Sequence, residues 1–113
     1  MHELSIAQSV IEIVEDNIKS QPSSKVRTVF MKVGKMSNVL VDSLVFGFDS
    51  LISGTELEGA KLEVEEIPLK IKCNECLAET ELERFTFMCT KCKSTKVEII
   101  SGNELTVSEI ELE

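Results

Sequence analysis

The sequence predicts an α+β fold, in which two helices pack on a three-stranded sheet and a small zinc-ribbon-like module is inserted before the last strand. Two stretches have the apolar periodicity of helices, and three alternate as strands do. The four cysteines form two Cys-x-x-Cys pairs. At 113 residues the chain has room for one small domain and a satellite that is too small to fold alone.

The first predicted helix covers residues 4–19. Its apolar side chains recur at steps of three and four: Leu4, Ala7, Ile11, Val14 and Ile18. Ser5 and Gln8 have the spacing of a capping box, in which each side chain satisfies a backbone N–H at the helix start. Such a cap leaves residues 1–3 outside the helix and free. Pro22 ends the segment, because proline cannot continue a helix.

The next two elements are a strand and a helix. Residues 26–33 alternate and are rich in β-branched side chains, as expected of a strand, and Gly34 ends it. A second helix is predicted over residues 42–53, with Asp42 as its N-cap and Gly54 as its stop. Its predicted buried face consists of Leu44, Val45, Phe48, Leu51 and Ile52.

Residues 61–67 and 105–112 are the two remaining long strands. The first changes phase, because apolar residues stand at even positions early and at odd positions later. A strand has a period of two, so this slip requires a bulge or bend near residues 65–66, and Pro68 cannot donate to a sheet ladder. If this strand and the one at 26–33 are neighbours joined through the second helix, they should be parallel.

The phase change marks a predicted domain boundary. Residues 1–66 plus 104–113 form the α/β domain, and residues 67–103 form the cysteine module. Inside the module we expect a hairpin over residues 77–88 and a short strand over residues 96–100.

The cysteine pairs carry the most specific motif in the chain. Their members are Cys73, Cys76, Cys89 and Cys92. Two tight turns that each direct two sulfurs at one ion supply the tetrahedral set that structural zinc prefers, with iron in the same cage as the closest alternative. Two disulfides fit poorly because no export signal is recognised, and a redox Cys-x-x-Cys usually stands alone. A four-ligand site is closed, so this metal is expected to hold structure.

Composition argues against several classes of function. A net charge of −8 disfavours nucleic acid, and five Phe with no Trp or Tyr leave little surface for base stacking. No apolar run reaches the length of a membrane span, and we expect a cytoplasmic protein. No nucleophile set or phosphate-binding loop is present, so neither hydrolysis nor GTP binding is expected of this chain.

The only histidine in the chain is His2. Its ordinary interpretation is an exposed side chain at a frayed end. Position two also permits a chelate, in which the α-amine of Met1 and the amide and imidazole of His2 close fused rings on one ion. The amide of Glu3 completes a planar set of four nitrogens. Such a set suits Ni(II) or Cu(II), whereas Zn(II) prefers a tetrahedron.

Several motifs together give the chain a family resemblance. They are the start Met-His-Glu-Leu-Ser-Ile, Val33-Gly34-Lys35-Met36-Ser37, Phe46-Gly47-Phe48, Gly59-Ala60-Lys61-Leu62, the two Cys-x-x-Cys pairs and Gly102-Asn103-Glu104-Leu105. In these motifs, over essentially its whole length, the chain resembles the HypA/HybF family of hydrogenase nickel-incorporation proteins.

The resemblance implies a nickel metallochaperone and no enzyme activity. It implies that Met1, His2 and Glu3 bind nickel, and that the four cysteines bind structural zinc. It also implies that the chain delivers Ni(II) to the large subunit of [NiFe]-hydrogenase together with the GTPase HypB. Some members of the family also take part in urease maturation. The chain departs from the family at Lys35 and Leu40, where members often carry acidic residues.

Two other classes compete with this interpretation. One is a zinc-ribbon module that binds a protein complex or nucleic acid, and the other is a thiol-redox enzyme. The oligomeric state is left open between monomer and homodimer, because a terminal strand or module of this kind can be exchanged between copies.

Overall fold

The computed structural model describes residues 2–21, 24–83 and 86–113. The chain divides into two compact units. Unit 1 consists of Met1–Lys32, Val39–Glu65 and Thr106–Glu113, and unit 2 of Val33–Asn38 and Glu66–Leu105. All four cysteines belong to unit 2, together with the short segment 33–38 from the first half of the chain.

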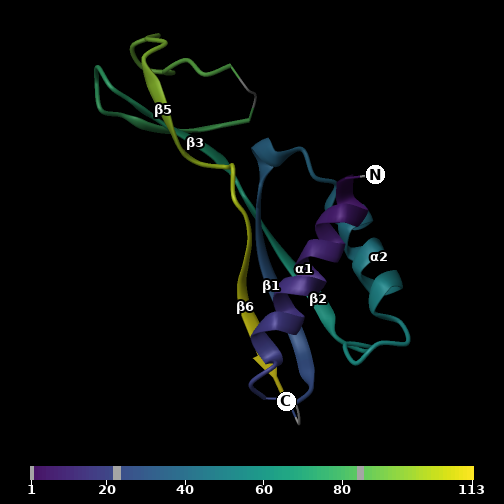
Figure 1. Ribbon diagram of the computed structural model, residues 1–113. Helices are drawn as coiled ribbons and strands as arrows, with labels where there is room; N and C mark the ends of the chain where they lie inside the picture. Colours follow the sequence, from purple (N-terminus) through teal and green to yellow (C-terminus); the bar gives the residue numbers. More distant parts are fainter. Residues whose placement is uncertain (1, 22–23, 84–85) are drawn as a thin grey trace. The chain divides into compact units, whose positions relative to one another are not determined.

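The elements follow one another as two helices and six strands among the described residues (Figure 1). They are α1 (His2–Ile18), β1 (Val26–Gly34), the 3-10 helix η1 (Lys35–Ser37), α2 (Val41–Ile52), β2 (Lys61–Ile67), β3 (Leu69–Cys73), β4 (Glu79–Leu82), β5 (Val97–Ser101) and β6 (Leu105–Leu112). The two helices and the three long strands confirm the predicted α+β class.

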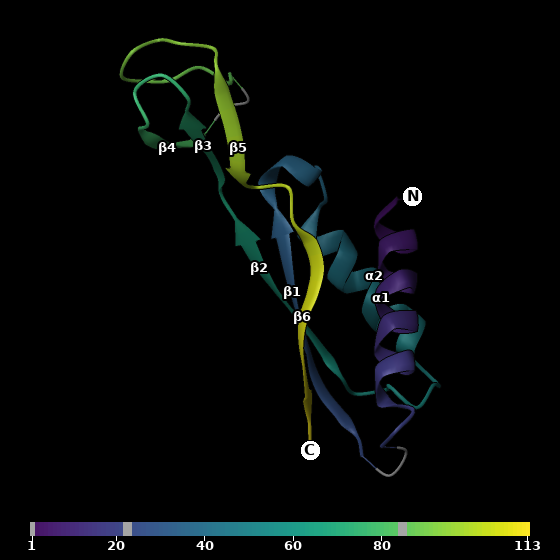
Figure 2. The same ribbon diagram turned by 60° about the vertical axis from the view of Figure 1, so that its left-hand side comes forward.

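Unit 1 is built on a three-stranded sheet with the order β2-β1-β6. The arrows of β1 and β2 point the same way in Figure 2, as predicted for neighbours joined through α2, and both helices lie on one side of the sheet. Its buried apolar side chains come from both layers and from the loop before β2: Ala7, Val10, Val14, Val26, Val29, Met31, Leu44, Phe48, Ile52, Leu57, Ala60 and Leu62. The core of unit 1 therefore lies between the helices and the sheet.

The helix starts differ from those predicted. Helix α1 begins at His2, so Ser5 lies inside the helix, is exposed, and cannot be its N-cap. Helix α2 begins at Val41 after Leu40, which makes no side-chain cap, and Asp42 lies in the first turn. In the first turn the negative charge of Asp42 interacts favourably with the helix dipole, but its side chain does not cap the helix. Both capping predictions are wrong, because each helix begins before the residue that was expected to cap it.

The end of α2 follows the prediction. The N–H of Thr55 donates to the carbonyl of Ile52 at 3.0 Å, and Gly54 between them has a φ of 79°. That left-handed conformation favours glycine. On the predicted buried face only Leu51 is exposed, at 37%.

Unit 2 contains a second three-stranded sheet, with the order β4-β3-β5. Both partners run antiparallel to β3, with Ile71 opposite Thr80 on one side and opposite Ile99 on the other. Its buried cluster is small and consists of Leu69, Ile71 and Leu82, against which Met36, Phe87 and Val97 pack.

Strand β5 confirms the predicted short strand near residues 96–100, but the predicted hairpin over residues 77–88 is wrong. The partner of β4 is β3, which ends at the first cysteine, so the first Cys-x-x-Cys pair lies in the turn between them. The phase change predicted near residues 65–66 appears as an interruption at Pro68 between β2 and β3. A separate register shift lies between Lys70 and Ile71, in the pairing of β3 with β5.

Gly34 lets two chain segments meet closely within unit 2. The N–H of Gly34 donates to the carbonyl of Glu104 at 2.7 Å, and the N–H of Met36 donates to the carbonyl of Gly102 at the same distance. A Cβ on Gly34 would lie 2.0 Å from the Gly102 oxygen, far inside any real contact. This position therefore requires glycine because of close backbone approach.

Replacing Gly34 with Ala is expected to destabilise unit 2 by roughly 3 kcal/mol, at the upper end of overpacking costs, since the obstructing atom belongs to the backbone. Chemical denaturation followed by circular dichroism measures the loss. Gly54→Ala is the control, because no atom lies within 4 Å of its added Cβ and only the positive φ opposes it. Equal losses for the two variants would contradict this account of Gly34.

Candidate metal centres

Each Cys-x-x-Cys turn, here called a knuckle, is closed by the same backbone hydrogen bonds. In the first knuckle the N–H of Leu77 donates to the carbonyl of Cys73 at 3.0 Å, and the N–H of Cys73 donates to the carbonyl of Ala78 at 2.9 Å. The second repeats this pattern, with the N–H of Lys93 donating to the carbonyl of Cys89 at 3.0 Å. Leu77 and Lys93 both have a φ of 63°. The two knuckles thus present their sulfurs in equivalent ways.

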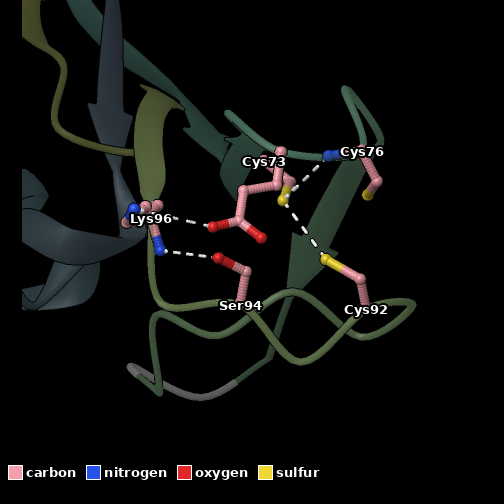
Figure 3. Close-up of polar contacts among 6 residues, drawn as sticks. Cys73, Cys76, Cys92, Ser94 and Lys96 are labelled. Carbon is pink, nitrogen blue, oxygen red and sulfur yellow. Dashed lines mark hydrogen bonds and ion pairs between the residues drawn. The ribbon is translucent and has the colours of Figure 1, made fainter.

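The four sulfurs converge on one point. All four Sγ atoms lie within 4.8 Å of one another. Two separations join the different knuckles: 3.5 Å from Cys73 to Cys92, which Figure 3 shows, and 3.6 Å from Cys76 to Cys89. A tetrahedron with zinc–sulfur bonds of about 2.3 Å has edges of about 3.8 Å. All four cysteines are free. The donor set therefore fits one tetrahedral zinc ion, and the predicted clustering is confirmed.

The knuckle backbone makes the four thiols unequal. A hydrogen bond from the Cys76 backbone is the largest cause that lowers the pKa of Cys73, and the backbone of Cys92 lowers the pKa of Cys89 to about 6. The pKa of Cys92 is raised to about 12, because its contacts with Cys73 and other thiols and its burial outweigh a hydrogen bond from the Ser94 backbone. In each knuckle the first cysteine is therefore the one that ionises first.

Polar contacts join the first knuckle to the segment that leads into β5. The N–H of Asn74 donates to the carbonyl of Lys96 at 2.8 Å. Within the second segment, the N–H of Lys96 donates to the hydroxyl of Ser94 at 3.1 Å (Figure 3). The ion pair of Lys96 with Glu75 is long, at 3.8 Å, and both side chains are exposed. Such a pair contributes little, so the connection depends on the backbone hydrogen bond from Asn74 to Lys96.

The N-terminal residues are arranged differently from the prediction. His2 and Glu3 are the first residues of α1 and are not free, and the predicted ligand Met1 lies outside the described residues. The Nε2 of His2 lies 2.6 Å from Oε2 of Glu3, and the N–H of Leu40 donates to the same oxygen at 3.5 Å. Glu3 is buried, with 7% of its surface exposed.

The burial of Glu3 could not be predicted from residue types and spacing. The oxygen of Glu3 is held by a backbone N–H, and a backbone partner leaves no mark in residue identity. Across residues 2–21, 24–83 and 86–113, the cysteines are the one group of three or more His, Cys, Asp and Glu side chains close enough to share an ion. Among the same residues, neither α1 nor α2 has both the length and the hydropathy of a membrane-spanning helix.

A family model described as "Hydrogenase/urease nickel incorporation, metallochaperone, hypA" matches residues 1–112. The chain belongs to the HypA family. Among the relatives of this HypA chain is a hydrogenase maturation factor HypA from Desulfatibacillum aliphaticivorans, which is 45% identical over 113 residues covering 99% of this chain and 87% of that protein. The factor of the same name from Azotobacter vinelandii is 34% identical, with full coverage of both chains.

Solved structures share the fold of this HypA chain. The solution structure of the Ni metallochaperone HypA from Helicobacter pylori has a TM-score of 0.66 at 23% identity, and covers 97% of this chain and 96% of that one. A second structure, described as the solution structure of HypA protein, has a TM-score of 0.73 at 24% identity, with 99% and 96% covered. These likenesses confirm the predicted fold class.

The left-handed Leu77 yields a stability prediction. Its side chain is 67% exposed and makes little packing contribution, while a positive φ is unfavourable for leucine. Leu77→Gly is therefore expected to stabilise zinc-loaded unit 2 by about 1 kcal/mol in urea denaturation. Leu105→Gly is the matched control, because this leucine is 42% exposed and lies in β6. Destabilisation by both variants would contradict relief of strain at Leu77.

Zinc affinity should fall as the pH falls, because the ligands are thiolates and binding displaces their protons. At neutral pH Cys89, with a pKa of about 6, is largely ionised, whereas Cys92, with a pKa of about 12, must release a proton. Below about pH 6 Cys89 also holds a proton, so the slope of affinity against pH should steepen there. Competition with a chelator across this range measures both effects, and an affinity independent of pH would contradict them.

Proposed function

We propose that this HypA chain carries one Ni(II) on its first three residues and passes it on for [NiFe]-hydrogenase maturation, without catalysing a reaction. The observation that carries the proposal is the separation of two kinds of site. The cysteines offer a closed cage that one zinc ion saturates. The chain start offers an exposed imidazole beside backbone nitrogens at the end of a helix.

The start of α1 is suited to a site that must release its metal. The first N–H groups of a helix have no intrahelical acceptor, so those of His2 and Glu3 can lose their protons to nickel without breaking the helical ladder. The His2 side chain is 59% exposed, which leaves the imidazole open to solvent and to a receiving protein. In this proposal the α-amine of Met1 completes the ligand set.

The two sites also divide the chain by role. We assign nickel binding to residues 1–66 plus 104–113, and zinc binding through Cys73, Cys76, Cys89 and Cys92 to residues 67–103. The segment 33–38 folds with the cysteine unit and so extends the zinc-binding part. Zinc is the structural cofactor in this assignment, and nickel is the cargo.

The partners follow from the family and from the charge. The family resemblance favours a HypB-type GTPase, the hydrogenase large subunit and urease maturation proteins. Unit 1 has 13 acidic and 5 basic residues, whereas the two kinds are equal in number in unit 2. An acidic nickel-binding unit repels nucleic acid and favours protein surfaces with basic character.

Nickel titration of the chain with its native first residue tests the proposal. His2→Ala and a Gly-Ser extension before Met1 should each abolish tight nickel binding, because one removes the imidazole and the other moves the α-amine away from His2. Both variants should keep the zinc and the circular dichroism spectrum of the parent.

The same Gly-Ser extension placed after Glu113 is the control and should bind nickel normally. Nickel binding that survives in both N-terminal variants would contradict the proposed terminal site. The cysteines would then have to be tested as the nickel ligands.

A further inference from the structure

The carboxylate of Glu3 is unusual in its surroundings. It is the one charged side chain among the buried residues that the structure describes. Burying a carboxylate is costly unless hydrogen bonds replace its water. Here Oε2 accepts from Nε2 of His2 at 2.6 Å and from the N–H of Leu40 at 3.5 Å. The carboxylate thereby ties the first turn of α1 to the residue that precedes α2.

The contact with His2 is not a consequence of helix geometry. Side chains at adjacent positions of a helix do not face each other, so the His2 imidazole must turn to reach Glu3. In this orientation the two nitrogens of the imidazole have different roles. Nε2 donates to the carboxylate, and Nδ1 remains available to a metal.

The free nitrogen is the one that can chelate. Nδ1 is close enough to the amide nitrogen of its own residue for both to bind one ion, whereas Nε2 points away from that amide. Ligation through Nδ1 thus recruits deprotonated backbone nitrogens, which form the planar set that Ni(II) accepts. An imidazole bound through Nε2 alone would instead leave the metal free to adopt the tetrahedral geometry that Zn(II) prefers.

We propose that Glu3 determines metal selectivity as a positioning residue, and that its carboxylate is not itself a nickel ligand. By occupying Nε2 it commits His2 to Nδ1 and hence to planar nitrogen ligation. Its hydrogen bond from Leu40 holds the carboxylate in place before metal arrives. This inference rests on the proposed terminal nickel site and specifies how that site favours nickel over zinc.

Metal affinities of Glu3→Ala and Glu3→Gln test the inference, with the cysteine site already filled with zinc. Glu3→Ala should lower nickel affinity roughly ten- to hundredfold, as is typical when the hydrogen-bond partner of a ligating histidine is lost. It should not lower zinc affinity at the terminus, because it frees Nε2 for tetrahedral ligation. Glu3→Gln should keep most of the nickel affinity, because its amide oxygen can accept both hydrogen bonds. Glu12→Ala, which removes an exposed carboxylate from the same helix, is the control and should have no effect.

The position of the proton on His2 gives a readout that a purely structural role would not move. The ¹⁵N chemical shifts of the metal-free wild type at alkaline pH should place the proton on Nε2, and Glu3→Ala should lose that preference. A proton on Nδ1 in the wild type would overturn the inference, and this measurement needs no variant to fold.

Two further results would also overturn the inference. One is an equal loss of nickel and zinc affinity in Glu3→Ala, and the other is a nickel affinity equal to that of Glu12→Ala. Failure of the proposed function looks different, because His2→Ala would then bind nickel as tightly as the wild type.

Discussion

Four thiolates on one ion are the constraint on which unit 2 depends. Its buried apolar cluster has three members, Leu69, Ile71 and Leu82, which is too little apolar surface to offset the conformational entropy of a unit of this size. Domains this small usually need a metal or disulfides. The knuckles place all four sulfurs within 4.8 Å, so metal binding and folding of this unit should be a single process. A metal that holds the fold together cannot also be the metal that is given away.

The chain start meets the opposite requirement. A carrier must bind its cargo with ligands that a partner can reach and replace, and the His2 side chain is more than half exposed. Exposure alone would give a poorly defined site. The buried carboxylate of Glu3 supplies the missing order, because it fixes the imidazole from the protected side. The His2 imidazole is therefore both held in one orientation by Glu3 and accessible to a receiving protein.

Much of this organisation follows from local patterns. The helical and strand periods predicted both helices and all three long strands of unit 1, and the spacing of the cysteines predicted their convergence. The predictions that were wrong all depended on where an element begins or which segment pairs with it. Ser5 and Asp42 have the chemistry of caps but lie inside helices that start earlier. The partner of β4 is β3, across the first knuckle, and no pattern within residues 77–88 indicates that pairing.

The fold class, the zinc-binding motif and the family could be predicted from residue types at fixed spacings. The environment of Glu3 became visible only in the folded chain. Its carboxylate is buried and accepts a hydrogen bond from the backbone of Leu40, which lies 37 positions further along the chain. A backbone N–H is the same in every residue except proline, so residue identity cannot reveal which one a side chain will meet. Folding brings the Glu3 carboxylate to the N–H of Leu40, and this contact orders the start of the chain.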